Sequence, residues 1–101
     1  MIINTTFVVG SDISEKWQKW LKTVFATSAS EAGMDGLLVM EVLDAQSEAE
    51  NSNTYAVQLR GCDNDALHWQ QSVLPALLRK MYVIWGEKAV SFTTIMQELE
   101  L

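Results

Sequence analysis

The order of strand and helix patterns along the chain is the feature that most restricts its fold. Residues Ile2 to Val9 alternate between two sides and are rich in β-branched side chains, which predicts a strand. At the other end, Gly86 closes a helical pattern and Ala89 to Met96 again has the composition of a strand. Between them lie a helical stripe from Asp12 onward, strand patterns over Leu37–Leu43 and Thr54–Arg60, and a second helical stripe from Asp63 or Asn64. The predicted order is therefore βαββαβ.

This order predicts an α+β protein with the ferredoxin-like βαββαβ plait. Two βαβ units that share a hairpin place four strands in one antiparallel sheet. Because crossover connections are right-handed, both helices are expected on one face of that sheet. A chain of 101 residues has the size of one domain. We expect a single ferredoxin-like domain over residues 1–101.

The connections carry their own predictions. Asp12 is expected to cap the first helix through its side chain. Residues Thr27 to Gly36 mix helix formers with Ser and Gly, so we expect the helix to stop before Gly33 and a mobile connection to follow. The polar residues Asp44 to Asn53 predict a long hairpin loop. Pro75 predicts either a kink or the start of a new helical turn.

The alternation of each strand assigns its residues to two faces of the sheet. The face covered by the helices is expected to hold Ile3, Phe7, Val9, Leu38, Met40, Val42, Tyr55, Val57, Leu59, Phe92 and Met96. The open face is expected to hold Ile2, Asn4, Thr6, Val8, Leu37, Val39, Glu41, Leu43, Ala56, Gln58, Ser91, Thr93 and Ile95. A solvated sheet face is normally polar, whereas this one is largely aliphatic. The pattern favours a homodimer through the open face, or a ligand, over strands that simply tolerate exposed valine and isoleucine.

The charge balance argues against a nucleic-acid partner. Seven Lys and Arg stand against thirteen Asp and Glu, and the resulting net charge of −6 repels a phosphate backbone. The one cysteine, Cys62, cannot form an internal disulfide and is expected half-buried at a strand end, as in a reducing compartment. The first residues lack a signal-peptide pattern, and no apolar run approaches the ~20 residues that cross a bilayer. We expect a soluble cytoplasmic protein with no membrane partner.

No motif in the chain specifies an activity. The candidate ligand-binding residues are Asn4, Trp20, Glu41 and Gln58. Glu41 is an acid on the otherwise aliphatic open face, so in a dimer it needs Arg60, Gln58 or a symmetry mate as a partner, or else a raised pKa. Trp20 belongs either to helix-to-sheet packing or to an aromatic box. His68 has no ligand-type residues at metal spacing, so no metal, cofactor or catalytic residue is predicted.

Several segments together form a longer pattern. They are Met1-Ile2-Ile3-Asn4-Thr5-Thr6-Phe7, Trp17-Gln18-Lys19-Trp20-Leu21-Lys22, Tyr55-Ala56-Val57-Gln58-Leu59, Pro75-Ala76-Leu77 and Gly86-Glu87-Lys88-Ala89-Val90-Ser91-Phe92-Thr93-Thr94. In order and spacing they resemble a bacterial family known as domain of unknown function 4286, over nearly the whole chain. The resemblance implies a ferredoxin-like protein of the dimeric α/β-barrel type, in which two sheets pack face to face, and it implies no established activity. The chain departs from the family pattern at Thr23-Val24-Phe25-Ala26, where relatives carry a His-Ile-Pro-like piece, and at Glu41, where relatives often carry a basic residue.

The sequence thus favours an uncharacterised dimeric module that binds a small apolar or aromatic molecule, or a protein partner. The segment from Thr27 to Gly36 is a candidate lid over the ligand. The competing hypothesis is an interaction or structural module that binds no ligand at all. The alternative is a cofactor-free oxygenase or isomerase of the dimeric α/β-barrel type, for which only Asn4 and Glu41 offer a polar group on the sheet.

Overall fold

The computed structural model describes residues 1–43 and 51–101, so most of the predicted hairpin loop, Asp44 to Asn53, lies outside the described residues. The elements in chain order are β1 (Ile2–Gly10), α1 (Ser14–Trp20), a π-helical turn (Leu21–Phe25), α2 (Ala26–Glu31), β2 (Asp35–Glu41), β3 (Ser52–Arg60), α3 (Asp63–His68), a further π-helical turn (Trp69–Val73), α4 (Leu74–Trp85), a 3₁₀ turn (Gly86–Lys88) and β4 (Ala89–Met96). The helical segments follow one another without a break, as a run before β2 and a run before β4. The predicted order βαββαβ is confirmed.

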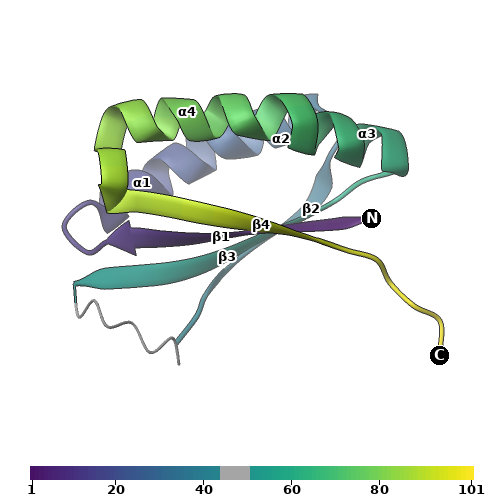
Figure 1. Cartoon of the computed structure of the whole chain (residues 1–101), viewed down its shortest axis with the longest axis horizontal. Helices are drawn as coiled ribbons and strands as arrows, with labels where there is room; N and C mark the ends of the chain where they lie inside the picture. Colours follow the sequence, from purple (N-terminus) through teal and green to yellow (C-terminus); the bar gives the residue numbers. More distant parts are fainter. Residues whose placement is uncertain (44–50) are drawn as a thin grey trace.

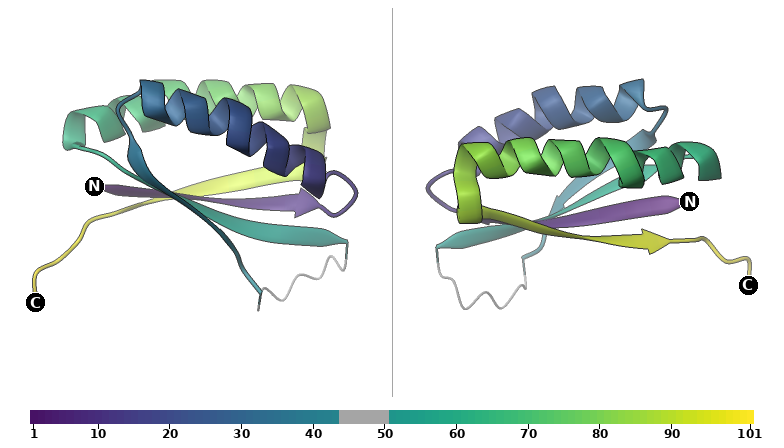
Figure 2. Two further views of the ribbon diagram at one scale, coloured as in Figure 1. Left: turned by 180° about the vertical axis from the view of Figure 1, so that it is seen from behind. Right: turned by 45° about the horizontal axis from the view of Figure 1, so that its top comes forward.

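The strands form one antiparallel sheet in the order β2-β3-β1-β4. Both helical runs lie on the same face of this sheet, and the other face carries no helix (Figure 1). Figure 2 shows the same two layers from behind and with the top tilted forward, with the residues after β4 leading away from the sheet. The architecture is the ferredoxin-like plait that the order of elements predicts.

Each helical run widens into a π-helical turn near its middle. One turn, Leu21–Phe25, joins α1 to α2, and the other, Trp69–Val73, joins α3 to α4. Pro75 lies in the first turn of α4, directly after the second of these turns. Proline has no backbone N–H, and the first turn of a helical segment does not need one as a donor. Proline is therefore tolerated at this position. The helix therefore continues past Pro75 as a new α-helical segment, which is one of the two predicted outcomes.

An aromatic cluster fills the space between the helices and the sheet. Phe7, Trp17, Phe25 and Trp69 are fully buried there. The ring of Trp17 stacks on that of Tyr55 at a centroid distance of 4.8 Å and lies 5.0 Å from that of Phe7. Phe25 stands edge-on to Trp69 at 5.3 Å. These aromatic contacts add to the burial energy of the cluster and fix the first helical run over β1 and β3.

The predicted facing of β2 is wrong. Glu41 lies opposite Tyr55, and residues directly opposed on neighbouring strands share a face, so Glu41 points to the helix side. The corrected assignment puts Leu37, Val39 and Glu41 on the helix side and Leu38 and Met40 on the open side, while Val42 and Leu43 lie beyond the strand. A break in register between Asp35 and Leu38 marks a β-bulge in this strand. The sequence cannot reveal the facing, because residues 37–40 are all apolar and do not alternate.

The facing of β4 is reversed in the same way. Phe92 lies opposite Thr6 on the open side, and Thr93 lies opposite the buried Thr5 on the helix side. The corrected assignment puts Phe92 and Met96 on the open side and Ser91, Thr93 and Ile95 on the helix side. The hydroxyl oxygens of Thr5 and Thr93 are 3.1 Å apart, within hydrogen-bond distance. This contact between side chains binds β4 to β1 in the observed register.

The cap predicted at Asp12 is also wrong. The first helix begins after Ile13 and has no side-chain cap. The Asp12 carboxylate instead accepts a hydrogen bond from Lys88 Nζ at 2.6 Å. That hydrogen bond, together with the positive charge of Lys88, lowers the pKa of Asp12. Asp12 thus connects the β1–α1 loop to the turn before β4.

The segment from Thr27 to Gly36 is not the mobile connection that its composition predicts. Helix α2 continues to Glu31, and Gly33 reverses the chain with a φ of 81°. Met34 is buried in the core, and β2 already begins at Asp35. The segment is therefore a helix end followed by a tight turn, and it offers no lid.

Candidate functional site

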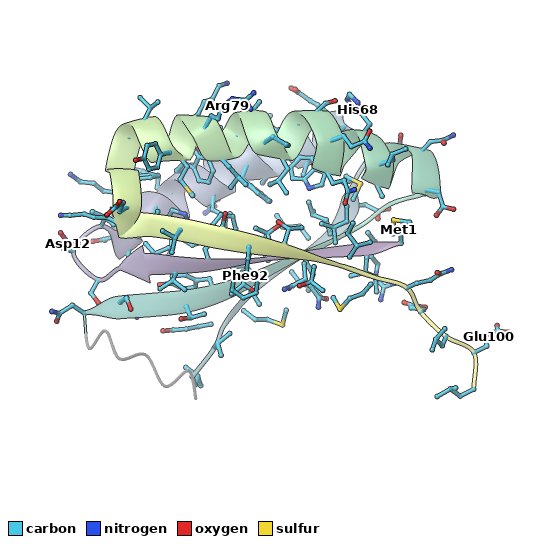
Figure 3. The ribbon with its side chains drawn as sticks, in the orientation of Figure 1. Met1, Asp12, His68, Arg79, Phe92 and Glu100 are labelled. Atoms are coloured by element: carbon cyan, nitrogen blue, oxygen red, sulfur yellow. The ribbon has the colours of Figure 1, made fainter. Side chains whose placement is uncertain are left out.

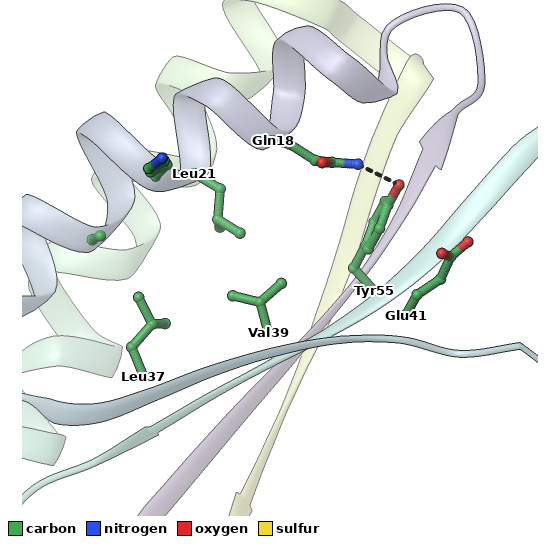
Figure 4. A pocket seen from close by; sticks show the side chains of 8 residues that line it. Gln18, Leu21, Leu37, Val39, Glu41 and Tyr55 are labelled. Carbon is green, nitrogen blue, oxygen red and sulfur yellow. Dashed lines mark hydrogen bonds between the residues drawn. The ribbon is translucent and has the colours of Figure 1, made fainter.

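A groove of about 430 Å³ runs between the first helical run and β2. It is lined by Gln18, Leu21, Lys22, Ala26, Leu37, Val39, Glu41 and Tyr55. Figure 4 shows Leu21 pointing from the helix toward Leu37 and Val39, which rise from β2, while Gln18, Tyr55 and Glu41 lie toward one end. The volume lies in the usual range for small-molecule sites.

The groove exists because the helix layer does not cover the sheet evenly. The helical face of the central strand β1 is buried at every second residue from Ile3 to Val9. On β2, by contrast, every residue is exposed, and Val39 keeps 46% of its surface exposed although it faces the helices. The aromatic cluster holds the first helical run over the centre of the sheet, so the edge strand β2 forms an uncovered apolar floor.

The polar end of the groove is held by a small hydrogen-bond network. Tyr55 is buried, and its hydroxyl lies 2.5 Å from Ser14 Oγ. The same hydroxyl accepts a hydrogen bond from Gln18 Nε2 at 3.0 Å. A buried phenol needs such partners, and here they fix the positions of both Tyr55 and Gln18. The network presents an amide to the groove in a set orientation.

Glu41 contributes the negative charge at the rim of the groove. Its carboxylate accepts a hydrogen bond from Asn53 Nδ2 at 3.2 Å. Of the partners predicted for it, Arg60 forms an ion pair with Glu98 instead, and Gln58 lies on the open side of the sheet. Lys22 supplies a positive charge to the same groove. The groove thus combines apolar walls with one acid, one base and one amide.

The predicted ligand-binding residues do not form one site. Asn4 and Gln58 lie opposite each other on the open face, where Asn4 Nδ2 donates to Thr6 Oγ1 at 3.1 Å. Glu41 lies on the other face, in the groove. Trp20 belongs to the helix layer, where it stands edge-on to Trp85 at 6.0 Å and borders a separate groove between the helical runs. The structure therefore places the four residues in three locations.

The remaining residues that could bear chemistry lie apart from the groove. His68 is exposed on the outer side of the helix layer, on the same side as Arg79 (Figure 3). Cys62 is exposed just before α3, not half-buried as predicted. Within residues 1–43 and 51–101, no three His, Cys, Asp or Glu side chains converge as a metal site. None of the helices in the same ranges has the length and apolar character needed to cross a bilayer.

Several groove residues are missing from the sequence-based prediction. Gln18, Leu21, Lys22 and Ala26 follow one another at spacings of three, one and four residues on the first helical run. Helical spacing alone groups these residues on one side of the helix. It does not show that this side stands over an exposed edge strand, because that depends on how the helix lies on the sheet.

The fold and the groove define a ferredoxin-like protein with an open, amphipathic groove at one edge of its sheet. The chain belongs to the family described as Domain of unknown function (DUF4286), whose profile matches residues 1–99. This confirms the family resemblance of the sequence. Among curated proteins, none matches the chain.

Proposed function

We propose that residues 1–101 act as one domain that serves as a homodimeric interaction module, with the open sheet faces of two copies packed against each other. The observation that carries this proposal is the apolar character of the open face. Its large exposed apolar side chains are Leu38, Met40, Val90 and Phe92. The partly buried apolar residues of the same face are Ile2, Val8 and Ala56 on the central strands and Met96 on β4. Of the four exposed side chains, that of Phe92 is the most exposed, at 61%. Contiguous apolar surface of this kind usually marks a protein contact.

The composition of the open face also fits a twofold contact. The exposed apolar residues lie on the outer strands β2 and β4, and the central strands carry the polar Asn4, Thr6 and Gln58 beside apolar residues. A twofold interface brings the same patch of each copy together, so amides in the centre can hydrogen-bond across it while the apolar flanks are buried. Stable interfaces of this type bury on the order of 1,200 Å² or more in total.

Replacement of Phe92 by Asp is expected to halve the mass of the particle in solution. The substitution puts a charge into the apolar surface of the open face, and burying an unpaired charge is costly. Figure 3 shows Phe92 on the side of the sheet away from the helices, so the fold itself does not depend on its side chain. Light scattering coupled to gel filtration at micromolar concentration measures the mass, and circular dichroism checks the fold.

The matched control is Val83→Asp. Val83 is 84% exposed on the outer side of the helix layer, so this charge lies far from the open face and should leave the mass unchanged. A wild-type particle with the mass of one chain, 11.3 kDa, would contradict the proposal.

A second candidate function is the binding of a small amphipathic molecule in the groove beside β2. The groove favours a ligand with an apolar body and a polar group that reaches Glu41 or the amide of Gln18. Since Trp17 stacks on Tyr55 of the groove wall, a bound aromatic or aliphatic molecule should change the tryptophan fluorescence. We expect Leu37→Asp to abolish such a change, whereas Leu43→Asp, outside the groove, leaves it intact. Screening of metabolites without any saturable response would count against this candidate.

The enzymatic alternative receives no support from the geometry. It depends on Asn4 or Glu41 as a polar group within an enclosed cavity. Asn4 lies on the open face and Glu41 on the helix side, so the two cannot act on one substrate. The groove that contains Glu41 is open to solvent along β2.

The cytoplasmic location expected from the free thiol of Cys62 stays a prediction.

A further inference from the structure

The outer edge of β2 is exposed to an unusual degree. Leu37, Leu38, Val39 and Met40 are consecutive large apolar residues, and each is exposed although they point alternately to both faces of the sheet. The bulge of β2 lies between Asp35 and Leu38, before the regularly paired stretch Leu38–Glu41, and the strand Asp35–Glu41 contains no Lys, Arg or Pro. Proteins usually protect edge strands with such residues, because an unprotected edge pairs with another chain. Within the described residues, no strand pairs with this edge.

The backbone groups that point to this edge follow from the hydrogen bonds of β2 with β3. Val42 N–H donates to the carbonyl oxygen of Thr54 at 2.9 Å, so the polar groups of Val42 point toward β3. In an antiparallel pair these groups alternate in direction along the strand. Those of Met40 and Leu38 therefore also point toward β3, and those of Val39 and Glu41 point outward.

We propose that the edge of β2 pairs antiparallel with the β2 edge of a second copy, about a twofold axis at Val39. In this register the two Val39 residues face each other and exchange both backbone hydrogen bonds. Leu38 then lies opposite Met40 of the partner copy on the open side. On the helix side, Leu37 lies opposite Glu41 of the partner copy. The two sheets join into one continuous sheet.

Charge disfavours the registers whose axis lies closer to Glu41. An axis at Glu41 would oppose the two Glu41 carboxylates directly, and an axis at Met40 would leave them only two positions apart. Both arrangements bring like charges closer together on the helix side of the sheet. With the axis at Val39, the two Glu41 residues stand four positions apart, roughly 13 Å along the strands. The pairing then brings only apolar residues and neutral backbone groups to its centre.

The pairing also completes the groove beside β2. Leu37 and Lys22 line the same groove, so a Glu41 carboxylate from the partner copy opposite Leu37 enters the groove that Lys22 lines. Among the described residues Lys22 forms no ion pair within its own chain. The two grooves become one cleft, with β2 of both copies as its floor and a helical run on each side. The contact is made by the backbone edge of β2, whereas the proposed face-to-face dimer uses the open face; Leu38 and Met40 belong to both.

Disulfide trapping tests the register on the intact chain. In a background with Cys62→Ser and with Phe92→Asp, which removes the face-to-face contact, a variant with both Leu38→Cys and Met40→Cys should shift from 11.3 kDa to a covalent species of twice that mass under mild oxidation. The pair is not directly hydrogen-bonded, so its Cα atoms lie about 4.5 Å apart, which a disulfide can span. Each single variant lacks the matching cysteine and should stay at 11.3 kDa on a denaturing gel. Equal trapping of the single and double variants would overturn the register.

A proline substitution tests the contact without cysteines. Val39→Pro removes an outward N–H that the folded protomer does not use, and edge strands tolerate proline at such positions. We expect it to halve the mass in solution, whereas Val39→Thr, which keeps the N–H and the β-branched side chain, leaves the mass unchanged. If Val39→Pro does not fold, the disulfide experiment decides alone. An unchanged mass for folded Val39→Pro, or no covalent dimer, overturns the inference.

The two homo-oligomeric contacts give different results. If Val39→Pro halves the mass and Phe92→Asp does not, the edge contact stands and the proposed face-to-face dimer falls. If only Phe92→Asp halves the mass, the reverse holds. If both do, and their combination reduces the mass to 11.3 kDa, the particle uses both contacts.

Discussion

Replacement of Trp17 by Ala is expected to lower the free energy of unfolding by about 3–5 kcal/mol, a large part of the stability of a small domain. Trp17 is fully buried and contacts the rings of both Phe7 and Tyr55, so truncation leaves a cavity between α1 and the sheet. The loss also removes the wall against which Tyr55 is held at the groove. Urea unfolding followed by circular dichroism measures the change.

Trp17→Phe separates the contribution of ring packing from the cost of the unpaired indole N–H. The indole N–H of Trp17 is buried and has no hydrogen-bond partner within the described part of the chain. Phenylalanine keeps an aromatic ring and removes that unpaired donor, so its cost should be well below that of alanine. If phenylalanine and alanine destabilise equally, ring packing does not explain the role of this residue.

Replacement of Gly86 by Ala is expected to cost about 1–3 kcal/mol of stability through the backbone alone. Gly86 ends α4 with a φ of 59° and a ψ of −134°, a combination that residues with a Cβ rarely adopt. An added Cβ would meet no atom within 4 Å, so steric contact with the rest of the protein does not contribute. Thermal and urea unfolding should both report the loss.

Lys88→Ala is the control for the same turn. It removes the ion pair between Lys88 and Asp12 and leaves the backbone conformation at Gly86 unchanged. Both side chains of this pair are largely exposed. Exposed ion pairs contribute little to stability. A loss for Lys88→Ala as large as that for Gly86→Ala would mean that the ion pair, not the glycine conformation, holds β4 to the end of α4.

The sequence by itself determined the order of the elements and the structure of the sheet centre. The alternation in Ile2–Val9 and around Val57 matches the buried positions of β1 and β3, because these strands have helices on one face only. The closing strand Ala89–Met96 has the predicted bounds. The end of the first helical run before Gly33 follows from the requirement for a positive φ at that turn.

Only the tertiary structure decided the facing of the edge strands and the place of the groove. In β2 the residues Leu37 to Met40 are all apolar, so their sequence does not alternate. The hydrophobic pattern therefore fits both possible facings of the strand equally well. The pairing with β3, including the bulge after Asp35, sets their direction. The groove depends in turn on where the aromatic cluster holds the first helical run over the sheet. Local sequence encodes each element, whereas the relative placement of elements arises from contacts between residues far apart in the chain.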